Sequence, residues 1–418
     1  MTAVDVGVDI TVDRPRTPTP APRATERVPL RRWLAVAAMA VGTFALVTVE
    51  SLPVGLLPFI GSSLHVSEGT AGLMVTVPGL VASATAPLLP VAIRRLDRRI
   101  ALLGLIVPMV AANALSALAP NFAILLTARF LVGIGIGGFW AFAAGLAVRL
   151  VPERSVPRAV AIVFGGATAA NVLGVPAGTL IGGLGDWRIA FVAVAGLGVI
   201  VLVALFVLLP PLPAGQAVQP RTLAREFRDP VVRAGVLATF LPVSGHFAAF
   251  TFVSPLLQDV SGIDEGMVGP LLLGFGAAGI AGTFLAGAAS ARDVRVTIVT
   301  ISVVLTAVLT IFPLVGRTPI GGAALMIVWG LAFGGVPVGV QTWILKSAPE
   351  STEAATALNT SVFNLAIALG ALFGGIVANN VALTAVPTTG AVLALPTTLA
   401  MWHAGGAAHR GRDVTTPR

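Results

Sequence analysis

The stretch WLAVAAMAVGTFALVTVESLPVGLLPFI, residues 33–60, decides the fold class of this chain. Its 28 residues exceed the roughly 20 apolar residues that a helix needs to cross the hydrocarbon core of a bilayer. Its one charged residue is Glu50. A charge near the centre of a bilayer costs about 3 kcal/mol or more, so a carboxylate retained there is a functional candidate. The stretch therefore predicts a membrane protein with a functional acid in its first helix.

Eleven similar stretches follow. The chain is 56% hydrophobic and only 11% charged, and its mean hydropathy is +0.94. A soluble core cannot hide that much apolar surface, which indicates an all-α membrane protein of many spans. The twelve predicted spans are 33–60, 69–93, 100–119, 122–148, 158–184, 189–210, 233–257, 266–289, 295–315, 319–345, 354–378 and 381–402.

The polar segments divide the chain into domains. Residues 1–30 are rich in Pro, Thr and Arg and predict a disordered cytoplasmic tail. The longest polar interruption, residues 211–232, predicts a cytoplasmic linker between a six-helix bundle at 31–210 and a second at 233–403. Residues 404–418 predict a second cytoplasmic tail.

The basic residues indicate the orientation. With the N-terminus inside, 23 of the 26 Lys and Arg residues fall in the tails, the linker and the loops of one side. Cytoplasmic segments carry such an excess, which predicts both termini in the cytoplasm. The net charge of +8 is therefore explained by topology, and no nucleic-acid partner is expected.

Several absences narrow the function. The chain has no cysteine, which excludes disulfides, thiolate chemistry and cysteine-ligated metal. It has no Walker A lysine loop, so ATP is not the direct energy source. No nucleophile triad or metal-ligand cluster is visible either. We therefore expect no enzyme activity, no cofactor and no metal.

The two halves repeat each other at an offset of 197 residues. The charged and proline matches are the most informative, because glycine matches arise by chance in apolar sequence. Matched pairs include Pro58 with Pro255, Glu68 with Glu265, Arg95 with Arg292, Arg98 with Arg295, Gly133 with Gly330, Pro152 with Pro349, and Gly178 with Gly375. Two six-helix halves in parallel repeat resemble the major facilitator architecture, which has its substrate site between the halves near mid-membrane.

Arg129 is the expected partner of Glu50. Counted from the outer ends of their spans at 1.5 Å per residue, both lie roughly 10–14 Å deep. A pair at matched depth would lower the cost of burying either charge. Two interpretations remain open. One is a static structural pair, and the other is a switch that opens and closes as the carboxyl loads and releases a proton.

Six residues inside the spans are candidates to bind substrate: His246, Asn113, Asn171, Gln341, Asn364 and Trp140. At the offset of 197 residues His246 corresponds to Val49, which places it opposite Glu50. Histidine titrates near physiological pH, but a hydrogen-bonded structural histidine is the alternative. The amides either contact a polar substrate or join helices. Trp140 either stacks on a planar ring or packs.

Two glycine patterns fall inside spans. GIGIGG at 133–138 lacks a preceding strand, so it is no dinucleotide site. The fifth span has a small residue at every fourth position, from Gly166 to Gly182, which predicts close helix packing. Pro176 in that span predicts a kink.

Several motifs resemble the drug, sugar and nucleoside proton-antiporter branch of the major facilitator superfamily. TVESLPVGLL at 48–57 is similar to the signature of its first span. Arg129 with Gly133 matches its Arg-x-x-x-Gly motif, and GVPAG at 174–178 resembles its antiporter motif, with Gly174, Pro176 and Gly178. Further likeness, at GGFWA (137–141) and VWGL (328–331), is to bacterial purine ribonucleoside efflux pumps.

The resemblance implies proton antiport, with proton coupling at Glu50 and Arg129. The loop between the second and third spans departs from the family pattern. When Arg98 and Arg99 are aligned on the pattern's last two positions, Arg94 stands where the family has Asp. This puts the usual gating arrangement in doubt, and Asp97 is the candidate to replace that carboxylate.

We therefore predict a multi-pass transporter of the bacterial inner or plasma membrane. It would export a purine ribonucleoside, sugar or drug-like solute in exchange for protons, by rocking of two halves, and would act as a monomer. Hydrophobic multidrug export is the alternative within transport. A non-transporting membrane sensor is the alternative from another class.

Overall fold

The computed structural model describes residues 29–93, 95–152, 155–213, 229–347, 352–398 and 400–401. Nearly all of this part of the chain is helical, and it contains no strand. The all-α prediction is confirmed. Most of both predicted tails and of the linker, together with Arg94, lies outside the described residues.

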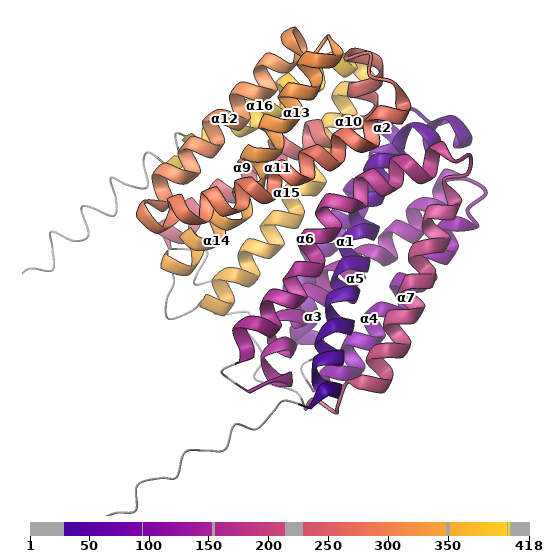
Figure 1. Ribbon diagram of the computed structural model, residues 1–418, viewed down its shortest axis with the longest axis vertical. Helices are drawn as coiled ribbons and strands as arrows, with labels where there is room; N and C mark the ends of the chain where they lie inside the picture. Colours follow the sequence, from indigo (N-terminus) through magenta and orange to yellow (C-terminus); the bar gives the residue numbers. More distant parts are fainter. Residues whose placement is uncertain are drawn as a thin grey trace, which may run out of the picture.

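The N-terminal half occupies one side of the molecule and the C-terminal half the other (Figure 1). The first half contains α1 (Leu30–Leu64), α2 (Glu68–Ala71), α3 (Leu73–Ala92), α4 (Arg98–Ala117), α5 (Phe122–Leu150), α6 (Val156–Gly183) and α7 (Arg188–Leu208). The second contains α9 (Pro230–Phe250), α10 (Val253–Pro255), a π-helix (Leu256–Val260), α11 (Glu265–Arg292), α12 (Val294–Val315), α13 (Pro319–Gly334), α14 (Val336–Ser347), α15 (Thr352–Asn380), a 3-10 turn (Leu383–Ala385) and α16 (Val386–Ala394).

Eleven segments of the described chain are long and apolar enough to cross a membrane. They correspond to the first eleven predicted spans. The twelfth predicted span, 381–402, contains the shorter α16 and residues outside the described set. Twelve crossings and the placement of both termini therefore stay predictions.

Two spans are interrupted where the sequence analysis expected one helix. The seventh turns after Phe250 and continues through the π-helix Leu256–Val260. The tenth is divided into α13 and α14 around Gly335. Pro337 lies at the start of α14 and has no N–H to give the preceding turn, which explains a break at that point.

The halves meet along four helix pairs. The central contacts are α3 with α15 and α6 with α11, while α2 with α15 and α1 with α10 join the ends that are predicted to be outside. Each half has its own large apolar core. The second core also takes in Val54 and Leu57 of α1, so the first helix contributes to both.

The internal repeat is confirmed by matching helix crossings. A Cβ on Gly133 would lie 2.6 Å from the carbonyl oxygen of Pro78, so α5 and α3 touch at their backbones. Gly330 meets the carbonyl oxygen of Phe275 in the same way. Both residues of the second contact follow their counterparts by 197 residues.

In α9 and α15 the offset is 196 residues, which corrects the constant offset expected from sequence. Gly174 packs on the Cα of Thr48, and Gly370 packs on the Cα of Ser244. Because Pro255 still matches Pro58 at 197, one extra residue lies between Ala248 and Pro255, around the turn that follows α9.

The shift changes two assignments. Gly178 faces the carbonyl oxygen of Leu52, and Gly374 faces that of Ala248, so Gly178 corresponds to Gly374 and not to Gly375. By the same shift, the counterpart of His246 is Glu50 itself and not its neighbour.

Candidate functional site

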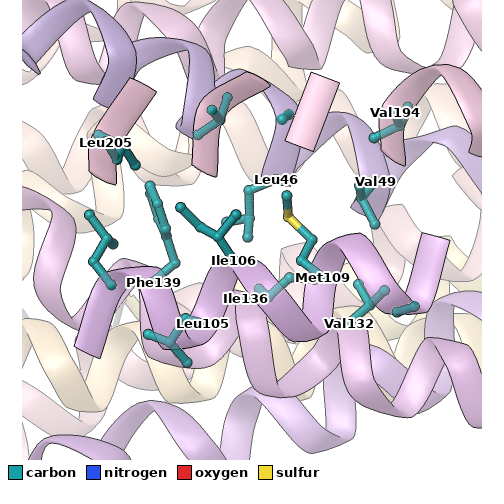
Figure 2. Close-up of a cluster of buried hydrophobic side chains, with 14 of the residues drawn as sticks. Leu46, Val49, Leu105, Ile106, Met109, Val132, Ile136, Phe139, Val194 and Leu205 are labelled. Carbon is teal, nitrogen blue, oxygen red and sulfur yellow. The ribbon is translucent and has the colours of Figure 1, made fainter. Parts of the chain in front are cut away.

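Glu50 lies on the face of α1 that is turned toward the second half. Residues three or four apart share one side of a helix, so Val47 and Val54 lie on the face of Glu50. Val47 packs against Ala167 with Trp140 beside it, and Val54 belongs to the apolar core of the second half. Val49, the residue before Glu50, points into the core of the first half, to which Leu46 also belongs (Figure 2). The Glu50 side chain is partly exposed on this shared face.

Arg129 is completely buried beside Glu50. Its Nε donates to the carbonyl oxygen of Met74 and its Nη2 to that of Val49, both at 3.0 Å. The contact with Val49 places Arg129 at the level of Glu50. No ion pair with Glu50 within 4 Å is formed among the described residues. The third nitrogen, Nη1, has no hydrogen-bond partner in that part of the chain.

The two side chains therefore do not form a closed ion pair in this structure. The guanidinium is held by backbone oxygens, so its position does not depend on the carboxyl. Its free Nη1 leaves a donor where a carboxylate could bind. A buried donor without a partner costs about 1–3 kcal/mol, and more for a charged group.

Gly133 explains how Arg129 reaches its two acceptors. It follows Arg129 by four residues, and Pro78 follows Met74 by four, so the two contacts lie one turn apart along the same crossing. A side chain at Gly133 would push α5 away from α3. In the Arg-x-x-x-Gly motif, the glycine therefore allows α5 to cross close to α3, and this crossing places the arginine beside its acceptor on α3.

The glycines of α6 form the predicted packing surface. A Cβ on Gly174 would lie 3.2 Å from Ser51, and one on Gly178 would lie 2.7 Å from the carbonyl oxygen of Leu52. A Cβ on Gly182 would lie 2.5 Å from the ring of Phe59. Pro176 lies within this helix, and its carbonyl oxygen accepts from Thr179. The stripe brings α6 against α1 around Glu50.

His246 is enclosed by aromatic rings. It is 1% exposed, and its Nδ1 accepts a hydrogen bond of 3.0 Å from Nε1 of Trp329. An indole nitrogen only donates, so the neutral imidazole carries its proton on Nε2. The ring stacks on Phe333 with centroids 3.3 Å apart and on Phe250 at 4.7 Å. The geometry matches the structural-histidine alternative and not an open substrate ligand.

The predicted amides fall in different places. Asn113 is buried on α4, which packs on α5 and α7, and its amide donates to Met109 on its own helix. Asn364 donates to Thr360 and lies where α15 meets Gly79 of α3. Among the described residues, neither of them is hydrogen-bonded to Glu50.

Trp140 and Asn171 lie on the surface of the first half that borders the second half. Trp140 contacts the ring of Phe164 at 5.6 Å, and Phe164 is 40% exposed. Asn171 is exposed and lies two turns further along the face of Phe164, between residues that contact α1 and residues that contact the second half. These three form an aromatic and polar surface on α5 and α6.

Gln341 belongs to a polar network that sequence reasoning did not find. Its Nε2 donates to Thr356 at 3.2 Å, and its Oε1 accepts from Asn359 at 3.5 Å. Asn359 in turn accepts from Thr239 at 2.6 Å. The network joins α9, α14 and α15. Threonines inside apolar helices give no signal, because most of them bond to their own backbone.

The loop before α4 is fastened within its own half. The side chain of Asp97 caps α4 by accepting from the backbone N–H of Arg99 at 2.7 Å, and it accepts from Leu212 at 2.9 Å. Arg98 N–H donates to the carbonyl oxygen of Leu212, and the Arg99 guanidinium donates to that of Phe206. Asp97 therefore joins α4 to the end of α7. Its predicted gating role stays a prediction.

A cavity of about 360 Å³ lies between the halves at the predicted outer end. Residues from both halves line it, including Pro58, Glu68, Pro255 and Asp259. It is separate from the Glu50 face, because none of its lining residues belongs to the middle of α1.

The Major Facilitator Superfamily model matches residues 39–371 of the chain. A purine ribonucleoside efflux pump, NepI, of Salmonella paratyphi C is 35% identical over 348 residues, which cover 83% of this chain and 88% of the pump. The pump of the same name from Escherichia coli O1:K1 is 34% identical over 362 residues, covering 87% and 91%.

The fold has solved counterparts. The inward-facing, unoccupied crystal structure of a bacterial homologue of the human lysosomal transporter Spinster superposes with a TM-score of 0.69 at 17% identity. The superposition covers 90% of this chain and 96% of that one. The chain belongs to the Major Facilitator Superfamily, a family of membrane transporters and not of enzymes. It is a multi-pass protein of the bacterial inner membrane.

Proposed function

We propose that this transporter exports purine ribonucleosides, or solutes of similar size and polarity, in exchange for protons. The substrate class is supported by the two efflux pumps, which match over more than four fifths of the chain. The observation that carries the coupling is the carboxyl of Glu50, partly exposed beside a buried arginine that other groups hold in place.

The proposed coupling uses Glu50 as the proton carrier. Protonated, the carboxyl is neutral and needs no counter-charge. Deprotonated, it is attracted to the free Nη1 of Arg129, since opposite charges attract strongly where water is scarce. Loading and releasing the proton thus changes the contact between α1 and α5. A change at this contact is a plausible trigger for the rocking of one half against the other.

The closed end of the proposed cycle is the outer one. Ser254 donates to the carbonyl oxygen of Val54, and Asn379 accepts from the N–H of Gly69, so both ends of the outer junction are hydrogen-bonded. At the other end, α5 and α14 pack mainly on helices of their own half. This pattern supports an inward-facing state, which the Spinster homologue also adopts.

Hydrophobic multidrug export is the second candidate. The exposed ring of Phe164 beside Trp140 favours it, because such a surface accepts many flat apolar solutes. The two candidates differ in whether a nucleoside moves protons.

The test uses inside-out vesicles with an acidic lumen and a lumenal pH dye. Purine ribonucleosides, sugars and cationic drugs are added in turn to vesicles with the wild type, with Glu50→Gln or with Glu265→Gln. Glu265 is an exposed carboxylate at the start of α11 and serves as the matched control. We expect nucleosides to make the lumen more alkaline in the wild type and the control, and not in Glu50→Gln.

Two results would contradict the proposal. Drugs that move protons where nucleosides do not would favour multidrug export. Full proton movement in Glu50→Gln would remove Glu50 from the coupling and return it to a structural role.

A further inference from the structure

The network around Gln341 runs from the core of the second half to its surface. Thr239 is fully buried and Asn359 is 5% exposed, whereas Gln341 and Thr356 are partly exposed. Asn359 bonds to the amide of Gln341, and Thr239 in turn bonds to Asn359. Buried polar groups of this kind rigidify a site when their hydrogen bonds are satisfied.

Gln341 lies on the face of α14 that is turned away from α12. Gly339, two residues earlier and so on the opposite face of α14, packs on α12, where a Cβ added to it would lie 3.2 Å from Ile298. The flanks of α14 are covered by α9, α11 and α15. The remaining face carries Pro337 and Gln341, and no helix of the first half packs closely on it.

The amide of Gln341 retains hydrogen-bonding capacity on both atoms. A carboxamide has two N–H donors and two acceptor positions on oxygen. Thr356 takes one donor and Asn359 fills one acceptor position. In the part of the chain that the structure describes, one donor and one acceptor position of this amide are left without a partner.

A planar base with a donor and an acceptor on adjacent atoms complements such a group. Glutamine pairs in this bidentate way with the amino group at C6 and the N7 of adenine. The edge formed by O6 and N1–H of hypoxanthine offers the same pair of functions. A pyrimidine or a hydrophobic drug lacks this purine edge at the same distance from a ribose.

We propose that Gln341, held by Asn359 and Thr356, recognises the C6 substituent of a purine base and so determines specificity. The inference rests on the proposed export of purine ribonucleosides and names the residue that reads the base. Pro337 lies one turn from Gln341, and its counterpart in the repeat is Trp140. The repeat therefore places an aromatic ring on the opposite wall, where a base could stack.

Binding to the full-length protein in lipid nanodiscs tests the proposal by calorimetry. The probes are adenosine, inosine and purine riboside, which has the same ring and sugar but no substituent at C6. We expect the wild type to prefer adenosine or inosine over purine riboside by about tenfold, the lower range of a bidentate contact.

The variants separate recognition from folding. Gln341→Met should abolish the preference, and Thr356→Val should reduce it, because that variant keeps the amide but loses one of its anchors. Asn380→Leu removes an exposed amide at the far end of α15 and should keep the full preference. If Gln341→Met does not fold, Thr356→Val alone decides.

Each outcome has one meaning. Loss of the preference in Gln341→Met with its retention in Asn380→Leu supports the proposal. Nucleoside binding with an unchanged preference in Gln341→Met and Thr356→Val, or with no preference in the wild type, overturns it and leaves the proposed function intact. Absence of any nucleoside binding to the wild type overturns both.

Discussion

Glu50 in α1 and His246 in α9 occupy equivalent positions in the two halves, but their surroundings differ in kind. Glu50 lies beside a buried guanidinium that is bonded to backbone oxygens. His246 is bonded to Trp329 and stacked between Phe250 and Phe333. At this level the first half therefore has two ionisable side chains close together, and the second half has a cluster of aromatic rings.

The frame that carries these groups is the same in both halves. Gly133 and Gly330 make the same backbone contact, one on α3 and one on α11. At the position of Arg129 the second half has Met326, which is fully buried. A repeated backbone with different side chains allows one half to handle protons and the other to handle substrate, which is the division that we propose.

The largest effect is expected when the buried charge of Arg129 is removed. Arg129→Met leaves the carbonyl oxygens of Met74 and Val49 without their charged donor, and each such hydrogen bond contributes about 1.5–3 kcal/mol. We expect proton-coupled uptake into inside-out vesicles to fall by about 100-fold or more. Arg317→Met, in an exposed loop, is the matched control and should transport normally. Normal coupling in Arg129→Met would show that the buried charge is dispensable.

Methyl groups at the two equivalent glycines should distinguish an effect on helix packing from an effect on proton coupling. Gly133→Ala and Gly330→Ala both force a Cβ against a backbone oxygen and should each cost about 1–3 kcal/mol, seen as a lower melting temperature. Gly133→Ala should in addition reduce proton coupling, because it displaces Arg129. Gly104→Ala has open space around it and should change neither quantity. Equal coupling in both glycine variants would contradict the division between the halves.

The smallest effect is expected at the aromatic cluster. His246→Phe leaves the buried N–H of Trp329 without its acceptor, which should cost about 1–3 kcal/mol of stability. The number of protons moved per substrate should not change. In the double variant with Trp329→Phe no polar group is left unpaired, so part of the lost melting temperature should return. A changed proton ratio in His246→Phe would make this histidine a second proton site.

Much of the fold could be predicted from apolar run length, because each helix crossing a bilayer needs about the same number of apolar residues. The repeat was predicted from residues matched at one offset and is confirmed, with the offset corrected in α9 and α15, and the predicted closeness of Arg129 to Glu50 along the chain axis agrees with its bond to Val49. The ion pair with Glu50 was not formed, since sequence shows the depth of a side chain but not which acceptor it reaches. Backbone oxygens of Val49 and Met74 are invisible to any pattern of side chains.

The sequence by itself determined the membrane class, the two repeated halves and the acid in the first span. These follow from composition, spacing and charge, which are properties of single helices. Only the tertiary structure decided the partner of Arg129, the enclosure of His246 and the network around Gln341. Each of these depends on which faces of separate helices meet, which the pattern of a single helix does not determine.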